Sequence, residues 1–153
     1  MSKRWCTGWL VIVAYSVIIT IGALAAERGT ADEAQAMVAK AIAAYDAKGT
    51  VAFVAMTAPS TQFRDRDLYV FVIGPDHQVV AHGVDAGRIG IDVSREVDPD
   101  GKAYGKEFIA RASATGVWVD YKFRDPITGK IAPKSSWVVR HDDYIFGCGF
   151  YKP

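Results

Sequence analysis

The last third of the chain holds three strand-like segments joined by short polar turns, and this pattern limits the fold more than any other feature. The segments GVWVDYKF, IAPKSSWVVR and YIFGCGFY (residues 116–123, 131–140 and 144–151) are rich in β-branched and aromatic residues, which favour strands. Turn residues separate them at 125–130 and 141–143. Strands joined so closely pair antiparallel, because a parallel connection needs about a dozen residues or more. Three consecutive antiparallel strands are therefore expected.

A further strand pair is expected in the middle of the chain. LYVFVI (68–73) and QVVAHG (78–83) flank the turn sequence Gly74–His77, which is typical of a β-hairpin. Residues 83–101 contain glycines, aspartates and a proline with little periodicity. We interpret them as a long connection packed over the sheet. The sequence thus predicts five antiparallel strands.

Three helices are expected outside the sheet. Thr30 and Glu33 form a capping-box pattern, in which each side chain bonds an otherwise unpaired N–H at a helix start. Gly49 is expected to end this helix, and Thr50 to cap a second one that stops before Pro59. A third helix is predicted within 103–115. Helices segregated from antiparallel strands indicate an α+β fold. Apolar residues at helical spacing line one side of the first helix: Ala34, Met37, Val38, Ala41, Ile42 and Tyr45.

The N-terminal segment has the three parts of a signal peptide. Lys3 and Arg4 precede an uncharged apolar run from Trp9 to Ala26, which contains the small-x-small sequence Ala23-Leu24-Ala25. Cleavage after Ala25 would make residues 1–25 the signal peptide and leave 26–153 as one domain, periplasmic or secreted. The alternative is an uncleaved membrane anchor, because the run nearly reaches the ~20 residues that span a bilayer.

Charge and cysteine content narrow the classes of partner. The formal charge is +1, and without Lys3 and Arg4 the remaining 16 basic and 17 acidic residues give nearly −1. This balance predicts neither nucleic-acid binding nor binding to an anionic membrane surface. Cys6 precedes the apolar run and would leave with the signal peptide, so Cys148 would remain alone. We expect Cys148 to be a buried, inert apolar residue and not a reactive thiol.

Four stretches together resemble the small single Cache domains, PAS-like extracytoplasmic sensors of bacterial chemoreceptors and histidine kinases. They are LYVFVIGPDHQVVAHG, DPDGKAYGKEFI, GVWVDYKFRDPITGKIAPKSSWVV and GCGFYKP. The similarity runs from about Ala31 to the C-terminus and is most specific between Trp118 and Trp137. It implies a five-stranded antiparallel sheet with a long N-terminal helix and shorter flanking helices. It also implies a pocket on the sheet, which binds small organic acids in several relatives.

A carboxylate in an apolar cleft needs a fixed cation or several hydrogen-bond donors, because an unpaired buried charge costs several kcal/mol. Lys134, in the matched sequence PKSSW, is the first candidate cation, and a solvated lysine beside a hairpin is the alternative. His82 is a candidate hydrogen-bonding residue, and a packing or surface histidine fits the sequence equally well. The candidate aromatic walls are Tyr69, Phe71, Trp118, Tyr121 and Trp137.

Strand alternation shows that this candidate set contains residues that cannot share one pocket. Trp118 and Tyr121 have opposite parity, as do Lys134 and Trp137. A regular strand cannot point both members of either pair toward the same pocket. Some of the candidates must therefore lie elsewhere, unless a bulge intervenes.

Catalytic and metal chemistry are not predicted, and no cofactor is expected. His77, His82 and His141 have no metal-ligand spacing, and no serine or cysteine nucleophile motif occurs. The aspartates within 92–100 lack the spacing and the closing glutamate of a calcium loop, and they are typical of a turn.

The sequence predicts an exported sensor domain and not an enzyme. It would recognise a small carboxylate, such as a short-chain or keto acid, through Lys134. Relatives of the Cache family continue into a second membrane helix and a signalling module, whereas this sequence ends at Pro153, so we expect action through a separate, membrane-bound signalling partner. The rival hypothesis is an interaction or assembly module with a vestigial pocket, whose first helix mediates a homodimer. A third hypothesis, a redox enzyme, depends on Cys148 alone.

Overall fold

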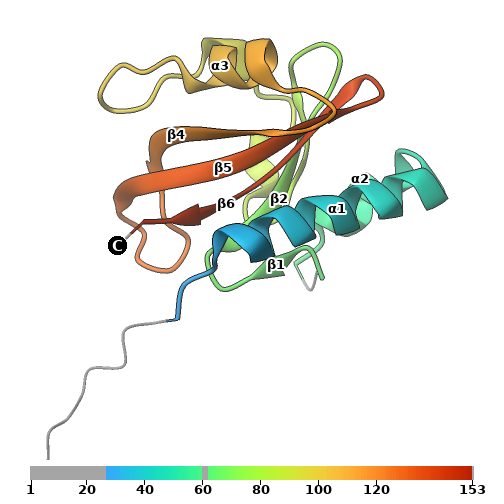
Figure 1. Cartoon of the computed structure of the whole chain (residues 1–153), viewed down its shortest axis with the longest axis horizontal. Coiled ribbons are helices and arrows are strands. Elements are labelled where there is room, and N and C mark those ends of the chain that lie inside the picture. The colour runs from blue at the N-terminus through green and yellow to red at the C-terminus, as the bar shows by residue number, and fades with distance from the viewer. Residues whose placement is uncertain (1–26, 60–61, 153) are drawn as a thin grey trace, which may run out of the picture.

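The computed structural model describes residues 27–59 and 62–152, in which helices cover both faces of one antiparallel sheet (Figure 1). The apolar run and the predicted cleavage after Ala25 lie outside the described residues. Among the described helices, none combines the length and the apolar character needed to cross a membrane. In chain order the elements are α1 (Ala31–Lys48), α2 (Val51–Thr57), β1 (Arg64–Asp65), β2 (Leu68–Ile73), β3 (Val79–His82), η1 (Ala86–Arg88), η2 (Val93–Arg95), α3 (Tyr104–Arg111), β4 (Val117–Arg124), β5 (Ile131–His141) and β6 (Tyr144–Tyr151).

The sheet has the strand order β1-β2-β6-β5-β4, and β3 also pairs with β2. These strands pair antiparallel, so all five predicted strands are confirmed. The structure adds the two-residue strand β1, which meets the start of β2 across a turn where Arg66 has a φ of 54°. β2 and β6 come from the two predicted groups of strands and lie side by side, with Val70 opposite Cys148.

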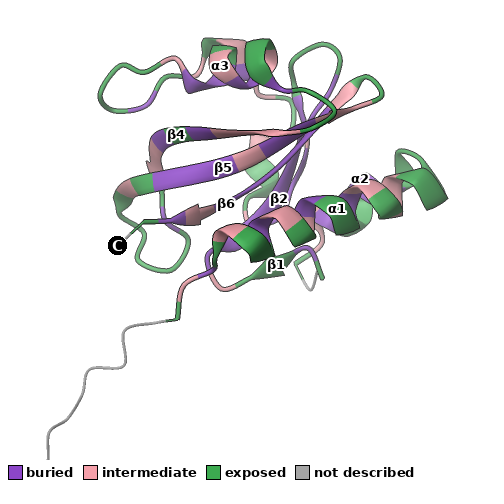
Figure 2. Cartoon of the chain, viewed as in Figure 1, coloured by how far each residue is buried: buried purple, intermediate pink, exposed green. Residues whose placement is uncertain are grey.

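The sheet is covered on one face by α1 and α2 and on the other by α3 with the preceding connection (Figure 1). Side chains of β2 alternate between the faces. Val70 and Val72 join the apolar cluster beneath α1, while Phe71 and Ile73 join the cluster beneath α3. All six residues of β2 are therefore buried (Figure 2), which explains why its sequence is continuously apolar and does not alternate.

α1 begins and ends as the sequence predicts. The Thr30 hydroxyl accepts the Glu33 N–H, and the Glu33 carboxylate accepts the Thr30 N–H at 2.8 Å. At the other end Gly49 has a φ of 61°, and its N–H donates to the Tyr45 carbonyl. The apolar stripe of α1 packs on the sheet of its own chain. That stripe is the surface that the rival hypothesis assigned to a homodimer.

α2 differs from the prediction at its first turn, because Thr50 does not act as a side-chain cap. The Thr50 backbone is helical (φ −63°, ψ −16°), and its hydroxyl makes no capping hydrogen bond. A capping side chain needs extended backbone to reach the free N–H groups. The chain reversal at Gly49 leaves Thr50 already inside the helical turn. α2 ends at Thr57, before Pro59, as predicted.

Aspartate side chains shape the connection before α3, and one of them ties it to the sheet. Asp85 and Asp92 accept backbone N–H groups at the starts of η1 and η2. Asp98 accepts three backbone N–H groups, one of them from Lys122 in β4. The predicted turn role of the aspartates within 92–100 is thus confirmed, and the long connection at 83–101 has a fixed path.

A buried carboxylate joins the segment before α1 to the end of β6. Asp67, whose side chain is 0% exposed, lies in the β1–β2 turn. Its Oδ1 accepts the Gly29 N–H at 2.6 Å, and its Oδ2 accepts the Tyr151 N–H at 2.9 Å. Arg28 adds an ion pair to Asp125 at 2.7 Å. The lead into α1 and the last strand are therefore fastened to one side chain.

Candidate ligand-binding site

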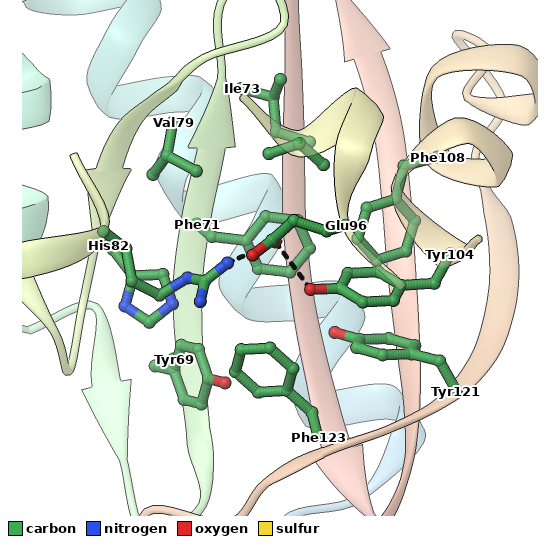
Figure 3. Close-up of a pocket in the computed structure, with 12 residues that line it drawn as sticks. Tyr69, Phe71, Ile73, Val79, His82, Glu96, Tyr104, Phe108, Tyr121 and Phe123 are labelled. Atoms are coloured by element: carbon green, nitrogen blue, oxygen red, sulfur yellow. Dashed lines mark hydrogen bonds and ion pairs between the residues drawn. The ribbon is translucent and has the colours of Figure 1, made fainter. Parts of the chain in front are cut away.

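A small cavity lies between the sheet and the layer formed by α3 and the 83–101 connection (Figure 3). Its volume is about 30 Å³, which is room for roughly one or two water molecules. The lining residues are Tyr69, Phe71, Ile73, Val79, His82, Arg88, Val93, Glu96, Tyr104, Phe108, Tyr121 and Phe123.

Aromatic rings form most of the cavity wall. Tyr104 from α3 stacks on Tyr121 from β4 at a centroid distance of 4.4 Å, and Phe108 stacks on Phe71 at 5.4 Å. The Tyr121 hydroxyl is hydrogen-bonded to Ser136 at 3.0 Å. Burial raises the pKa of Tyr121 well above its usual range. The wall is therefore rigid and apolar, and its hydroxyl groups stay neutral donors.

Lys134 is 1% exposed and packs behind the aromatic wall without being one of the residues that line the cavity. Strand pairing places it opposite Tyr121 on one side and Tyr151 on the other. Its Nζ is 3.8 Å from the centre of the Tyr69 ring and 5.0 Å from that of Tyr151. Within the described chain this nitrogen has no hydrogen-bond partner. Burial lowers the pKa of Lys134 to about 7, because an ammonium loses its hydration there.

Two glycines of β6 make room for the side chains of the site. A Cβ on Gly149 would lie 2.8 Å from the Lys134 Cε and 2.2 Å from the Ser136 Oγ. A Cβ on Gly147 would lie 2.1 Å from the Phe71 ring. Because such contacts are closer than any real Cβ contact, the sequence GCG is needed for these side chains to lie flat on the sheet.

His82, at the end of β3, forms a further part of the wall and contacts the Tyr69 ring at 4.9 Å. Its Nδ1 accepts the Asp85 N–H at 3.1 Å, which leaves the remaining proton of a neutral imidazole on Nε2. Burial lowers the pKa of His82 to about 3, and the positive charges of Lys134 and Arg88 add to this effect. His82 is therefore a neutral hydrogen-bond donor at physiological pH.

Arg88, Glu96 and Tyr104 form a polar cluster at the cavity edge that sequence reasoning missed (Figure 3). The Arg88 Nη2 is paired with the Glu96 Oε2, and the Tyr104 hydroxyl donates to the same oxygen at 2.6 Å. Arg88 ends η1 and Glu96 follows η2. No period or motif marks either residue, because both belong to an irregular connection whose path depends on the sheet beneath it.

An open cleft of about 510 Å³ adjoins the cavity. Tyr69, His82, Arg88 and Phe123 line both spaces and so form the boundary between them. The cleft is also lined by three further arginines, with only two aspartates: Arg64, Arg66, Arg124, Asp85 and Asp125. Two of the cleft arginines are already paired with carboxylates, Arg66 with Glu33 and Asp65 and Arg88 with Glu96.

The structure separates the predicted site residues into two groups. Tyr69, Phe71, His82 and Tyr121 line the cavity. Lys134 is not a lining residue, but its Nζ lies 3.8 Å from the centre of the lining Tyr69 ring and 5.6 Å from that of Phe123. Trp118 and Trp137 are not brought to this cavity. They pair with each other across β4 and β5, with ring centroids 5.3 Å apart, and pack on the α1 face of the sheet. The strands keep regular alternation here, so Tyr121 and Lys134 take one face and the tryptophans the other.

Cys148 is fully buried, as predicted, in the apolar cluster beneath α1. Burial raises its pKa to about 12, so the thiolate needed for nucleophilic chemistry is not formed at neutral pH. Among the described residues, no group of three or more histidine, cysteine, aspartate or glutamate side chains is arranged to hold a metal ion.

Comparison with solved structures shows the same fold in several sensor domains. A methyl-accepting chemotaxis protein from Vibrio parahaemolyticus matches with a TM-score of 0.66 and 19% identity over 78% of this chain and 86% of its own. The periplasmic sensor domain of a chemotaxis protein matches with a TM-score of 0.59 and 24% identity over 80% and 90% of the two chains. A Cache chemosensory domain described for carboxylic acid recognition matches with a TM-score of 0.60 and 20% identity over 80% and 88%.

Sequence comparison agrees with this fold. The sensor histidine kinase MctS of Rhizobium johnstonii is 38% identical over 88 residues, which are 56% of this chain and 19% of the kinase. The chain thus matches about a fifth of that kinase's length. The family described as single Cache domain 2 matches residues 10–152. The chain therefore belongs to the single Cache domain family, whose members are extracytoplasmic sensor domains of kinases and chemoreceptors.

Proposed function

We propose that the cavity binds a small carboxylic acid and that Lys134 is its counterion. The observation that carries this proposal is the Lys134 amine, 1% exposed and without a hydrogen-bond partner among the described residues. An ammonium in this position loses several kcal/mol of hydration, which the surrounding aromatic rings offset only in part. A carboxylate in the cavity restores both a charge partner and a hydrogen-bond acceptor.

Neutral donors around the amine support an anionic ligand of small size. The Tyr121 hydroxyl and the His82 Nε2–H belong to side chains that line the cavity. Such groups stabilise a carboxylate without adding a competing charge. The Tyr69 hydroxyl donates instead to the Tyr151 hydroxyl, whose own proton goes to the Arg124 carbonyl. The cavity volume of about 30 Å³ is below that of ordinary ligand pockets. The ligand is therefore short, and its entry from the cleft requires the boundary side chains to move.

The sensor role and its location extend this proposal. The chain is exported, by a signal peptide cleaved after Ala25 or by an anchor that remains, and its Cache domain reports ligand occupancy to a membrane-bound signalling partner. Membership of a family of sensor domains supports this role. The solved Cache domain described for carboxylic acid recognition supports the ligand class.

The test is a thermal-shift and calorimetric screen of short carboxylic acids on the wild type and on Lys134→Met. Met keeps the length and apolar stem of the side chain and removes the charge. An acid at 100 times its Kd is expected to add about 2.7 kcal/mol of stability to the wild type and nothing to Lys134→Met. Lys106→Met, at an exposed position on α3, is the control and should bind like the wild type.

Two results would reject the proposal. Equal acid binding by the wild type and Lys134→Met would remove Lys134 as the counterion. A wild type that no acid stabilises would favour the rival role as an assembly module with a vestigial pocket.

A further inference from the structure

The site contains two cations close to one ring and one resident carboxylate. The Lys134 Nζ lies 5.6 Å from the centre of the Phe123 ring, and the Arg88 Cζ lies 5.0 Å from the same centre. Phe123 lines both the cavity and the cleft. Arg88 and Glu96 line the cavity, so the second carboxylate of a ligand held at Lys134 would lie in the same space as this pair.

The two cations differ in their partners. Arg88 is paired with Glu96, whose Oε2 also accepts the Tyr104 hydroxyl at 2.6 Å. The Arg88 and Glu96 side chains are 17% and 19% exposed, so this pair is largely shielded from water. Lys134 has no such partner among the described side chains. The protein thus supplies a carboxylate to one cation and leaves the other for a ligand.

We propose that Glu96 makes the site selective for monocarboxylic over dicarboxylic acids, because it already fills the second carboxylate position. This inference rests on the proposed function. A monocarboxylate at Lys134 leaves two cations facing two carboxylates. A dicarboxylate that reaches toward Arg88 places its second carboxylate against Glu96, and like charges in a partly buried site repel strongly.

Arg88 and Tyr104 are therefore the donors of a second carboxylate subsite. Both donate to a single Glu96 oxygen, and one charged and one neutral donor could hold a ligand carboxylate in the same way. Glu96→Gln keeps the shape and length of the side chain and removes its charge. The variant frees Arg88 to pair with the second carboxylate of a ligand.

The experiment is calorimetry with propionate and with malonate on the wild type, Glu96→Gln and Glu107→Gln. Glu107 forms comparable ion pairs with Lys102 and Arg111 and does not line the cavity, so it is the matched control. The Kd of malonate divided by that of propionate is expected to fall about tenfold or more in Glu96→Gln. The ratio should be unchanged in Glu107→Gln.

A double variant tests whether the gain in malonate binding depends on Arg88, and it avoids leaving an unpaired buried charge that could unfold the protein. Arg88→Met with Glu96→Gln removes both members of the pair, so no unpaired charge is left. This double variant is expected to lose the gain in malonate binding, because the second subsite lacks its cation. Retention of the gain would overturn the assignment of Arg88.

The outcomes separate this inference from the proposed function. Propionate binding that needs Lys134, with the same malonate-to-propionate ratio in the wild type and Glu96→Gln, would overturn the inference alone. Wild-type binding of malonate as tight as that of propionate would also overturn it. Binding of neither acid to any of the proteins would reject the proposed function, and the inference with it.

Discussion

The amine nitrogen of Lys134 lies 3.8 Å from the centre of the Tyr69 ring, so a buried cation faces an aromatic surface where buried lysines usually face a carboxylate. A desolvated cation–π contact contributes about 2 kcal/mol, whereas removing an ammonium from water costs several kcal/mol. The rings therefore offset only part of the cost. The lowered pKa of Lys134, about 7, reflects the remainder.

Lys134→Met is expected to stabilise the protein, and more so at pH 7 than at higher pH. The folded pKa of Lys134, about 7, lies below its ordinary value of 10.5. Between these values the unfolded chain binds more protons, so wild-type stability rises with pH by at most about 1.4 kcal/mol per unit. The cost of the charge is fully present below pH 7 and absent above 10.5. Urea unfolding of both proteins across this window measures the effect, and a pH-independent difference would contradict it.

Affinity for a carboxylic acid anion is expected to fall as the pH rises above about 7. Binding pairs Lys134 with a negative charge and so raises its pKa, which means that the complex takes up a proton. Four other groups act on the pKa of Lys134: Asp125, Cys148, Arg88 and Asp67. Asp125, with a pKa of about 2, and Cys148, with one of about 12, do not titrate between pH 7 and 9. His82, with a pKa of about 3, stays neutral. Calorimetry in buffers of different ionisation enthalpy should show proton uptake at pH 8, and its absence would refute the coupling.

Trp137→Phe is expected to lower stability without changing acid affinity. Trp137 packs with Trp118 on the α1 face, on the opposite side of the sheet from the cavity. The smaller ring leaves unfilled space beside α1, at a cost of about 1 kcal/mol or more. Chemical unfolding measures the loss, and calorimetry with propionate the affinity. A clear loss of affinity at unchanged stability would place Trp137 in the site after all.

Gly149→Ala is expected to cost about 1–3 kcal/mol of stability, because overpacking forces neighbouring groups to shift. The new Cβ would meet the Ser135 carbonyl at 2.5 Å and the Lys134 Cε at 2.8 Å. A backbone oxygen cannot move away as a flexible side chain can, so the lysine stem is displaced and acid affinity falls with stability. Thermal unfolding and calorimetry check both effects. A variant as stable as the wild type would show that the strand relaxes around the methyl group.

Local sequence patterns predicted the helices and strands well, because capping, helix termination and strand alternation each depend on residues close together in the chain. The Thr30–Glu33 capping box and the Gly49 terminator act within one or two turns of helix, and both occur as expected. Strand periodicity likewise showed that Lys134 and Trp137 belong to different faces. It could not tell which face is covered by α1 and which holds the cavity, because that depends on the packing of distant elements.

The candidate site was only partly accessible from the sequence for the same reason. Tyr69, Phe71 and Tyr121 lie in strands whose alternation is regular, and all three line the cavity. His82 also lines it, but from β3, whose pairing with β2 shifts register. Arg88 and Glu96 come from an irregular connection whose two short turns are positioned by contacts with the sheet. Their pairing depends on the tertiary fold, and the spacing between the two residues in the sequence does not predict it.

The shared anchoring of Gly29 and Tyr151 on Asp67 has a mechanical consequence. A pull on the segment ahead of α1 loads the Gly29–Asp67 hydrogen bond, and a tilt of β6 loads the Tyr151–Asp67 hydrogen bond, so both movements act on one carboxylate. The Tyr151 ring is 5.0 Å from the Lys134 amine. A ligand that shifts this amine therefore acts next to the corner where the two chain segments leave the domain.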